Sequence, residues 1–298
     1  MKRTYFAPVA LLGLGLLSAC AGTAAPAAAQ SETPQQSLTA TGTAMATVQS
    51  ARFDANGTAT LTLPQALVDQ LRAAAGTQGS LGSVISSTMT VTFKLTGAAR
   101  RPDQVDATIT ASLGGLTINT EVIADGGQLY YKNPMTAKWE AVRRPAGGAS
   151  ETAKSGSAYQ ALLDTAKSVT EVTGQPSTLD GVAVDHYQIV PDLVRLFAQL
   201  TSANTPKNPQ ALTAIQGLLQ NASVTADVWT GSGDHLVRRL TYDTDVTADA
   251  SQLAATLGSS TSGLTIPAGS TVHVTAHAEV NLHNYNEPVT ITPPTITP

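Results

Sequence analysis

Apolar and polar residues alternate along several segments of this chain, and this period of two limits the fold more than any other feature. The two clearest runs place apolar side chains at every second position: Met89, Val91, Phe93 and Leu95, then Val105, Ala107, Ile109, Ala111 and Leu113. Leu116, Ile118 and Val122 continue the pattern after Gly114-Gly115, a pair typical of hairpin turns. Such alternation predicts antiparallel strands with one apolar face and one solvated face.

Weaker signals extend this reading to the rest of the chain. Further strands are predicted at 53–63, 128–132, 138–142, 182–190, 223–230, 236–246, 271–283 and 288–292. Helices are predicted at 38–49, 64–75, 157–169, 191–200 and 209–219, with Asp249 capping a short helix through Leu257. Many strands in one open sheet, with helices packed on one side, form an α+β architecture.

Composition narrows the possible partners and chemistry. The 298 residues include one cysteine and only 13% charged residues. Without Lys2 and Arg3, the 17 basic side chains fall to 15 against 21 acidic ones, a net charge near −6. Such a chain has no general attraction for nucleic acid or for anionic lipid surfaces. Beyond Cys20, neither disulfides nor thiolate metal sites are available.

The N-terminus carries an export signal. Lys2 and Arg3 precede an apolar run from Tyr5 to Leu17, about thirteen residues where a membrane-spanning helix needs ~20. The run ends in Leu17-Ser18-Ala19-Cys20, which resembles the lipobox of bacterial lipoproteins. The resemblance implies that residues 1–19 are removed as a signal peptide. It also implies that Cys20 receives a diacylglycerol and becomes the mature N-terminus.

The segment after Cys20 reads as a spacer. Residues 20–36 are rich in Ala, Thr, Pro and Gln and predict a flexible, lipidated tether, followed by a single domain at 37–298. A two-chain lipid anchor is durable, because one chain alone binds only marginally. Ala21 stands where an aspartate would, in the sorting systems that this resembles, retain a lipoprotein at an inner membrane. We expect anchoring to the outer membrane of a bacterium that has one, or otherwise to the outer face of the cell membrane.

A family resemblance rests on the segment from Tyr159 to Asp192. There an amphipathic helix leads to Gly174, then to Leu179-Asp180-Gly181-Val182, then to a strand with His186-Tyr187. Further matching stretches are Asp125-Gly126 before Leu129 to Lys132 and Trp139, Val228-Trp229 before Leu236 to Arg238, and Pro288 to Pro293. Together they resemble the LppX/LprG lipoproteins, which have a half-barrel fold like the carrier LolA. Segments 64–87 and 248–269 depart from that pattern, and the helical region 191–221 is long.

The resemblance implies a curved antiparallel sheet whose apolar concave face is covered by helices, with room between the layers for an acyl chain. The candidate cavity residues are Met89, Val91, Phe93, Ile109, Leu113, Leu116, Ile118, Val122, Leu193, Phe197, Leu200, Leu212, Ile215 and Leu219. The alternative is a densely packed core without space for an acyl chain, since ordinary protein interiors pack densely. Four aromatic residues are expected in the core: Tyr130, Trp139, Tyr187 and Trp229.

No catalytic or metal site is expected. The nucleophile elbow, the Ser-x-x-Lys pair, the P-loop and the zinc-helix motif are all absent. His273, His277 and His283 alternate with apolar residues, which predicts a strand with its histidines on the solvated face. At ~3.3 Å per residue His273 and His277 are about 13 Å apart, too far to share one ion. The sequence therefore indicates a protein without enzymatic activity or cofactor.

Two charged features complete the candidates. Asp243, Asp245 and Asp249 are spaced as in a calcium loop, but the glycine and the closing glutamate of such a loop are replaced by Ala248 and Ala254. A strand end and a helix cap explain these aspartates more simply. Arg238 shares parity with Leu236 and Leu240, so it would reach the edge of the apolar face. There it could hold a lipid phosphate or extend to water.

The leading hypothesis is a lipid-anchored envelope protein that binds a lipid or another amphiphile and carries or chaperones it. The expected partners are the membrane, through acylated Cys20, and the bound lipid, but no nucleic acid. A sensor or protein-interaction module on the same fold, with a filled core and an unidentified protein partner, is the main alternative. A spacer role in the envelope is the third.

Overall fold

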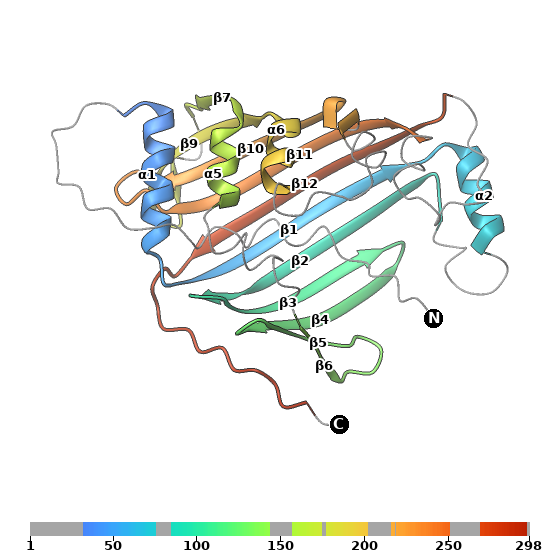
Figure 1. Cartoon of the computed structure of the whole chain (residues 1–298), viewed down its shortest axis with the longest axis horizontal. Coiled ribbons are helices and arrows are strands. Elements are labelled where there is room, and N and C mark those ends of the chain that lie inside the picture. The colour runs from blue at the N-terminus through green and yellow to red at the C-terminus, as the bar shows by residue number, and fades with distance from the viewer. Residues whose placement is uncertain are drawn as a thin grey trace.

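The computed structural model contains one large antiparallel sheet. It describes residues 32–75, 85–143, 157–174, 177–201, 216–217, 219–250 and 269–296. The sheet has twelve strands, is open rather than closed, and curves around one face (Figure 1). The strands are β1 (Ser50–Thr62), β2 (Thr88–Arg100), β3 (Gln104–Leu113), β4 (Leu116–Asp125), β5 (Gln128–Lys132), β6 (Trp139–Arg143), β7 (Ala166–Glu171), β8 (Thr178–Leu179), β9 (Val182–Pro191), β10 (Ala222–Gly231), β11 (Val237–Asp249) and β12 (Thr271–His283). This confirms the predicted α+β class and the curved antiparallel sheet.

The topology consists of two antiparallel meanders that meet where β1 pairs with β12. The strand order is β6-β5-β4-β3-β2-β1-β12-β11-β10-β9-β7, and β8 pairs separately with β9. The first strand therefore lies beside the last, with Phe53 opposite Leu282. The predicted hairpin at Gly114-Gly115 is present, and both glycines have positive φ angles.

Helices cover the concave face, called the inner face below. They are α1 (Pro34–Thr47), α2 (Gln65–Ala75), α5 (Ser157–Asp164) and α6 (Leu193–Thr201). The main core joins Leu38 of α1 and Leu162 of α5 to strand residues such as Phe53, Leu240 and Leu282. A second cluster joins Leu67 and Val68 of α2 to the far end of the same face. No helix in the described ranges is long and apolar enough to span a membrane.

Helix α1 begins earlier than the sequence predicts. The Thr33 hydroxyl accepts a hydrogen bond from the Gln36 backbone, and the Gln36 side chain accepts one from the Thr33 backbone. This capping box satisfies two free amide groups at the start of the helix, and Pro34 fits the first turn. Residues 34–36, assigned to the tether from composition, are therefore helical.

The helix predicted at 157–169 is too long. It ends at Asp164, and residues 166–171 form β7, an edge strand paired with β9. The Thr165 hydroxyl donates to the Ala161 carbonyl at the end of the helix. Beyond it, pairing with β9 satisfies backbone groups that a longer helix would leave open on the sheet edge.

The strand predicted at 288–292 is also wrong. This segment has no strand partner and lies on the convex, or outer, face of the sheet. Its alternation arises because Val289 and Ile291 both face the sheet, where they are buried against Ala98 and Ile123. Prolines on either side remove backbone donors that a central strand would need.

Loss of this packing should be measurable. Ile291 is 5% exposed, so Ile291→Ala should lower the free energy of unfolding by ~2 kcal/mol. Ile296, in the same segment but 39% exposed, is the matched control and should change it by less than ~0.5 kcal/mol when replaced by alanine. Urea unfolding followed by tryptophan fluorescence reports the change, because Trp139 packs against this cluster. Equal effects from both substitutions would contradict the docking of the segment.

Candidate functional site: the inner face of the sheet

Two reciprocal phenylalanine–glycine pairs lie on the inner face where β1 meets β2. Phe53 stands opposite Gly97, and Phe93 stands opposite Gly57. A Cβ atom on Gly97 would lie 2.7 Å from Phe53 Cζ, and one on Gly57 would lie 2.6 Å from Phe93 Cζ. Each ring therefore lies across the opposite glycine instead of standing up from the sheet. The two largest side chains here take little height above the inner face.

The strand register brings the predicted sheet residues together on this face. Val91 lies beside Leu113 and Leu116 in one cross-strand row, and Phe93 lies in the row with Ile118. The eight predicted sheet residues all lie on the inner side: Met89, Val91, Phe93, Ile109, Leu113, Leu116, Ile118 and Val122. A role in binding does not follow from placement alone.

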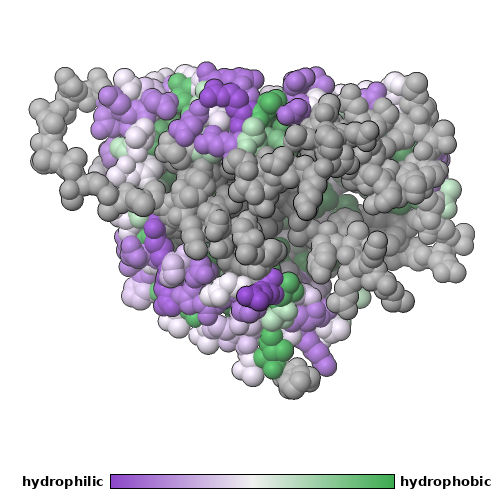
Figure 2. Space-filling model, in the orientation of Figure 1, coloured by the Kyte–Doolittle hydropathy of each residue, from purple (hydrophilic) through white to green (hydrophobic). Residues whose placement is uncertain are grey.

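Part of these two rows is open to solvent. Val91 is 37% exposed, Leu116 is 47% exposed and Ile118 is 49% exposed, although the rest of the inner face forms a core. In the orientation of Figure 1, hydrophobic residues are recessed in the right half of the molecule, in the area of β1 and β2 (Figure 2). Where β2 begins, β3 ends and β4 begins, the aliphatic side chains of the inner face are therefore only partly covered.

The predicted helix residues lie elsewhere. Leu193 and Leu219 line a cavity of about 530 Å³ where β9 ends and β10 begins. Phe197 lies on α6 and is partly buried. Leu212, Ile215 and the side chain of Leu200 lie outside the described residues. The structure therefore separates the predicted sheet residues from Leu193 and Leu219, which line this cavity.

Two tyrosines place hydroxyl groups among the apolar side chains of the inner face. The Tyr187 hydroxyl is hydrogen-bonded to Ser37 of α1, and burial raises the pKa of this tyrosine. Tyr242 of β11 packs against the main core, and within the described residues its hydroxyl has no hydrogen-bond partner. Burial raises the pKa of Tyr242 to about 12. An apolar environment of this kind disfavours any charged group.

This shift predicts how stability falls in alkali. The folded pKa of Tyr242 lies above its unfolded value near 10, so the folded protein keeps a proton that the unfolded chain loses. Stability from this group is complete below pH 10 and should fall by ~2–3 kcal/mol as pH rises to about 12. Tyr242→Phe should flatten that part of the curve, measured by urea unfolding at stepwise pH. An unchanged slope would show that Tyr242 ionises freely in the folded state.

Arg238, the predicted headgroup residue, has protein partners of its own. Its guanidinium forms an ion pair with Asp234 and lies 5.2 Å from the centre of the Tyr285 ring. The pairing of β10 with β11 shifts register at this point, so fully buried Val237 joins the core. The parity that predicted an inner position for Arg238 therefore does not hold across the bulge. These contacts give Arg238 a packing role at the start of β11.

The outer face carries the histidines, as predicted. His273 bonds Asp245 at 3.0 Å, His277 bonds Asp243 at 2.8 Å, and both pairs cross from β12 to β11. Two of the three aspartates that suggested a calcium loop, Asp243 and Asp245, are thus partners of histidines. Across the described ranges, no three His, Cys, Asp or Glu side chains come together as a metal site would need. The sequence analysis did not predict these pairs, although the alternation in both strands places these histidines and aspartates on the same face.

The expected core aromatics are mostly in place. Tyr187 is 5% exposed and Trp229 is 8% exposed, which confirms both as buried. Trp229 also stacks on His186, with ring centres 4.1 Å apart. Tyr130 and Trp139 are partly buried against the outer cluster. Cys20 lies outside the described residues.

Comparison with known proteins adds a fold likeness. No protein-family model matches the chain, and no curated protein matches it. Among solved structures, the chain is similar to the crystal structure of LprF from Mycobacterium bovis. The two share 14% sequence identity with a TM-score of 0.41, over 88% of this chain and 96% of that one. At this level of similarity, the function of one protein does not define the function of the other.

Proposed function

We propose that this chain is a lipid-anchored envelope protein that binds the acyl part of a lipid, or another amphiphile, against the inner face of its sheet. The observation that carries the proposal is the exposure of Val91, Leu116 and Ile118 at the open end of that face. Contiguous apolar surface of this kind marks ligand or partner sites in soluble domains. The predicted sheet residues would contact the acyl chain.

The orientation of the Phe93 ring supports this role. Because Phe93 lies across Gly57, the inner face keeps a low profile beside the exposed aliphatic residues. A larger residue at Gly57 would force the Phe93 ring upward into that space.

Energetics favour a carrier over a permanent store. Burying an alkyl chain gains ~0.8 kcal/mol per CH₂ relative to water, but a bilayer offers the same gain. Exchange between membrane and protein is therefore close to neutral. An anchor at Cys20 would hold the domain within a tether's length of the bilayer, which shortens the path for exchange.

Native mass spectrometry of the full chain with Cys20→Ser tests the proposal. This substitution removes the acylation site, so any lipid found is bound by the domain. We expect one co-purified amphiphile per protein, released by organic solvent. A protein that remains free of amphiphile after reconstitution with total bacterial lipid would reject lipid binding, and would favour a protein-interaction module that uses the same exposed residues.

A further inference from the structure

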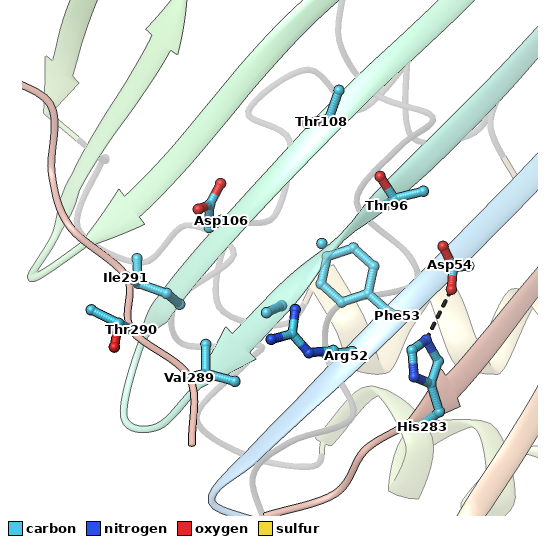
Figure 3. A pocket seen from close by; sticks show the side chains of 12 residues that line it. Arg52, Phe53, Asp54, Thr96, Asp106, Thr108, His283, Val289, Thr290 and Ile291 are labelled. Carbon is cyan, nitrogen blue, oxygen red and sulfur yellow. Dashed lines mark hydrogen bonds and ion pairs between the residues drawn. The ribbon is translucent and has the colours of Figure 1, made fainter. Parts of the chain in front are cut away.

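A separate hollow lies on the outer face, away from the proposed lipid site. It has a volume of about 410 Å³ and lies where β1, β2 and β3 meet the C-terminal segment (Figure 3). This volume falls within the range of small-molecule sites. Its chemistry differs from that of the inner face, because charged and hydroxyl side chains line most of it.

Two cross-strand rows line the hollow, and one of them carries both an arginine and an aspartate. Arg52 of β1 lies opposite Ala98 of β2, and Ala98 lies opposite Asp106 of β3. The Cα atoms of Arg52 and Asp106 are therefore about 10 Å apart, two strand spacings. Ala98, between them, carries only a methyl group, and Val289 and Ile291 of the C-terminal segment pack against it and close one side of the hollow.

Arg52 and Asp106 are the uncompensated charges of this site. Asp54 is bonded to His283 at 2.9 Å, and Glu121 is bonded to Lys132 at 2.7 Å. Within the part of the chain that the structure describes, the side chains of Arg52 and Asp106 have no hydrogen bond or ion pair. Figure 3 shows the Arg52 guanidinium extending over β2, with the Asp106 carboxylate across the hollow on β3.

The carboxylate of Asp106 is in an unfavourable setting as long as it stays unpaired. Partial burial, and then the negative charge of Glu121, raise the pKa of Asp106. A cation beside Asp106 would relieve both effects. At the other end of the hollow, a guanidinium is suited to a carboxylate or another planar anion.

We propose that this outer hollow binds a small zwitterion, with its anionic group on Arg52 and its ammonium group on Asp106. The hydroxyls of Thr96 and Thr108 lie in the next cross-strand row and line the same hollow, where they can bond polar atoms of the ligand. The site lies on the opposite face from the exposed aliphatic row, so it does not depend on the proposed lipid binding.

Titration calorimetry of the full chain with Cys20→Ser, using ω-amino acids of increasing length, tests this proposal. The probes are glycine, 4-aminobutyrate and 6-aminohexanoate, with hexanoate and hexylamine as ligands that carry one charge. We expect saturable binding with a best chain length, and at least about ten-fold weaker binding of hexanoate and hexylamine than of 6-aminohexanoate. Arg52→Gln and Asp106→Asn should each weaken the best zwitterion by at least about ten-fold.

The control variant is Asp243→Asn, which removes a carboxylate from the same face but outside this hollow. It should leave zwitterion binding unchanged. Because Arg52 and Asp106 are exposed on strands, their variants should keep the wild-type melting temperature, which is measured in parallel. The proposal is overturned if no probe saturates up to about 10 mM. It is equally overturned if hexanoate binds as well as 6-aminohexanoate and Asp106→Asn has no effect, since that result describes a simple anion site.

Discussion

Replacing Val91 and Ile118 together with glutamine should weaken binding of a fluorescent fatty acid by about ten-fold to a hundred-fold. Both residues lie on the inner face and are 37% and 49% exposed, so they need no rearrangement to meet a ligand. Loss of two aliphatic contacts, together with desolvation of two amides under an acyl chain, costs ~1–3 kcal/mol of binding free energy. A factor of ten corresponds to 1.4 kcal/mol, which sets the expected range.

The chain offers a matched control for this experiment. Thr92 follows Val91 and Thr117 precedes Ile118, and both threonines point to the outer face. The double variant Thr92→Gln, Thr117→Gln therefore changes the same two strands without touching the inner face. Displacement of the fluorescent fatty acid by unlabelled lipid is measured for both proteins. Equal affinities in the two variants would remove the open end of the sheet from the binding site.

Periodicity predicted the sheet well because one face of it is buried. In β2, β3 and β12 the alternation of apolar side chains fixes which residues face inward, and the register follows that pattern. The histidines of β12 were placed correctly for the same reason. The same reasoning failed at 288–292, where Val289 and Ile291 alternate on a segment that docks on the sheet without joining it.

Other features depend on contacts that a single sequence does not reveal. The bulge at Trp229 and Thr230 moves Val237 into the core and takes Arg238 out of the predicted alternation. Arg52 and Asp106 can be recognised as a pair beside the hollow only when the register of β1, β2 and β3 is known. Residues 166–171 form a strand because they pair with the open edge of β9. The helical periodicity of the local sequence does not reveal that edge.

Gly97→Ala should be among the most destabilising single substitutions in the sheet. A Cβ atom there would overlap the Asp106 carbonyl oxygen and lie 2.7 Å from Phe53 Cζ. The carbonyl belongs to the neighbouring strand and can move only if β2 and β3 separate. Alanine normally gains ~0.5–1 kcal/mol over glycine in an extended strand, but overpacking against a backbone atom costs ~3 kcal/mol, the upper end of the usual range. The clash therefore outweighs the gain.

The comparison with Gly233→Ala isolates this effect. A Cβ atom added at Gly233 would meet no other atom within 4 Å, and the residue has no positive φ angle, so alanine there should be neutral or slightly stabilising. A loss of ~3 kcal/mol at Gly97 corresponds to a fall in melting temperature of roughly 6–12 °C for a chain of this size. A Gly97→Ala protein that melts with the wild type would mean that Phe53 does not lie across β2.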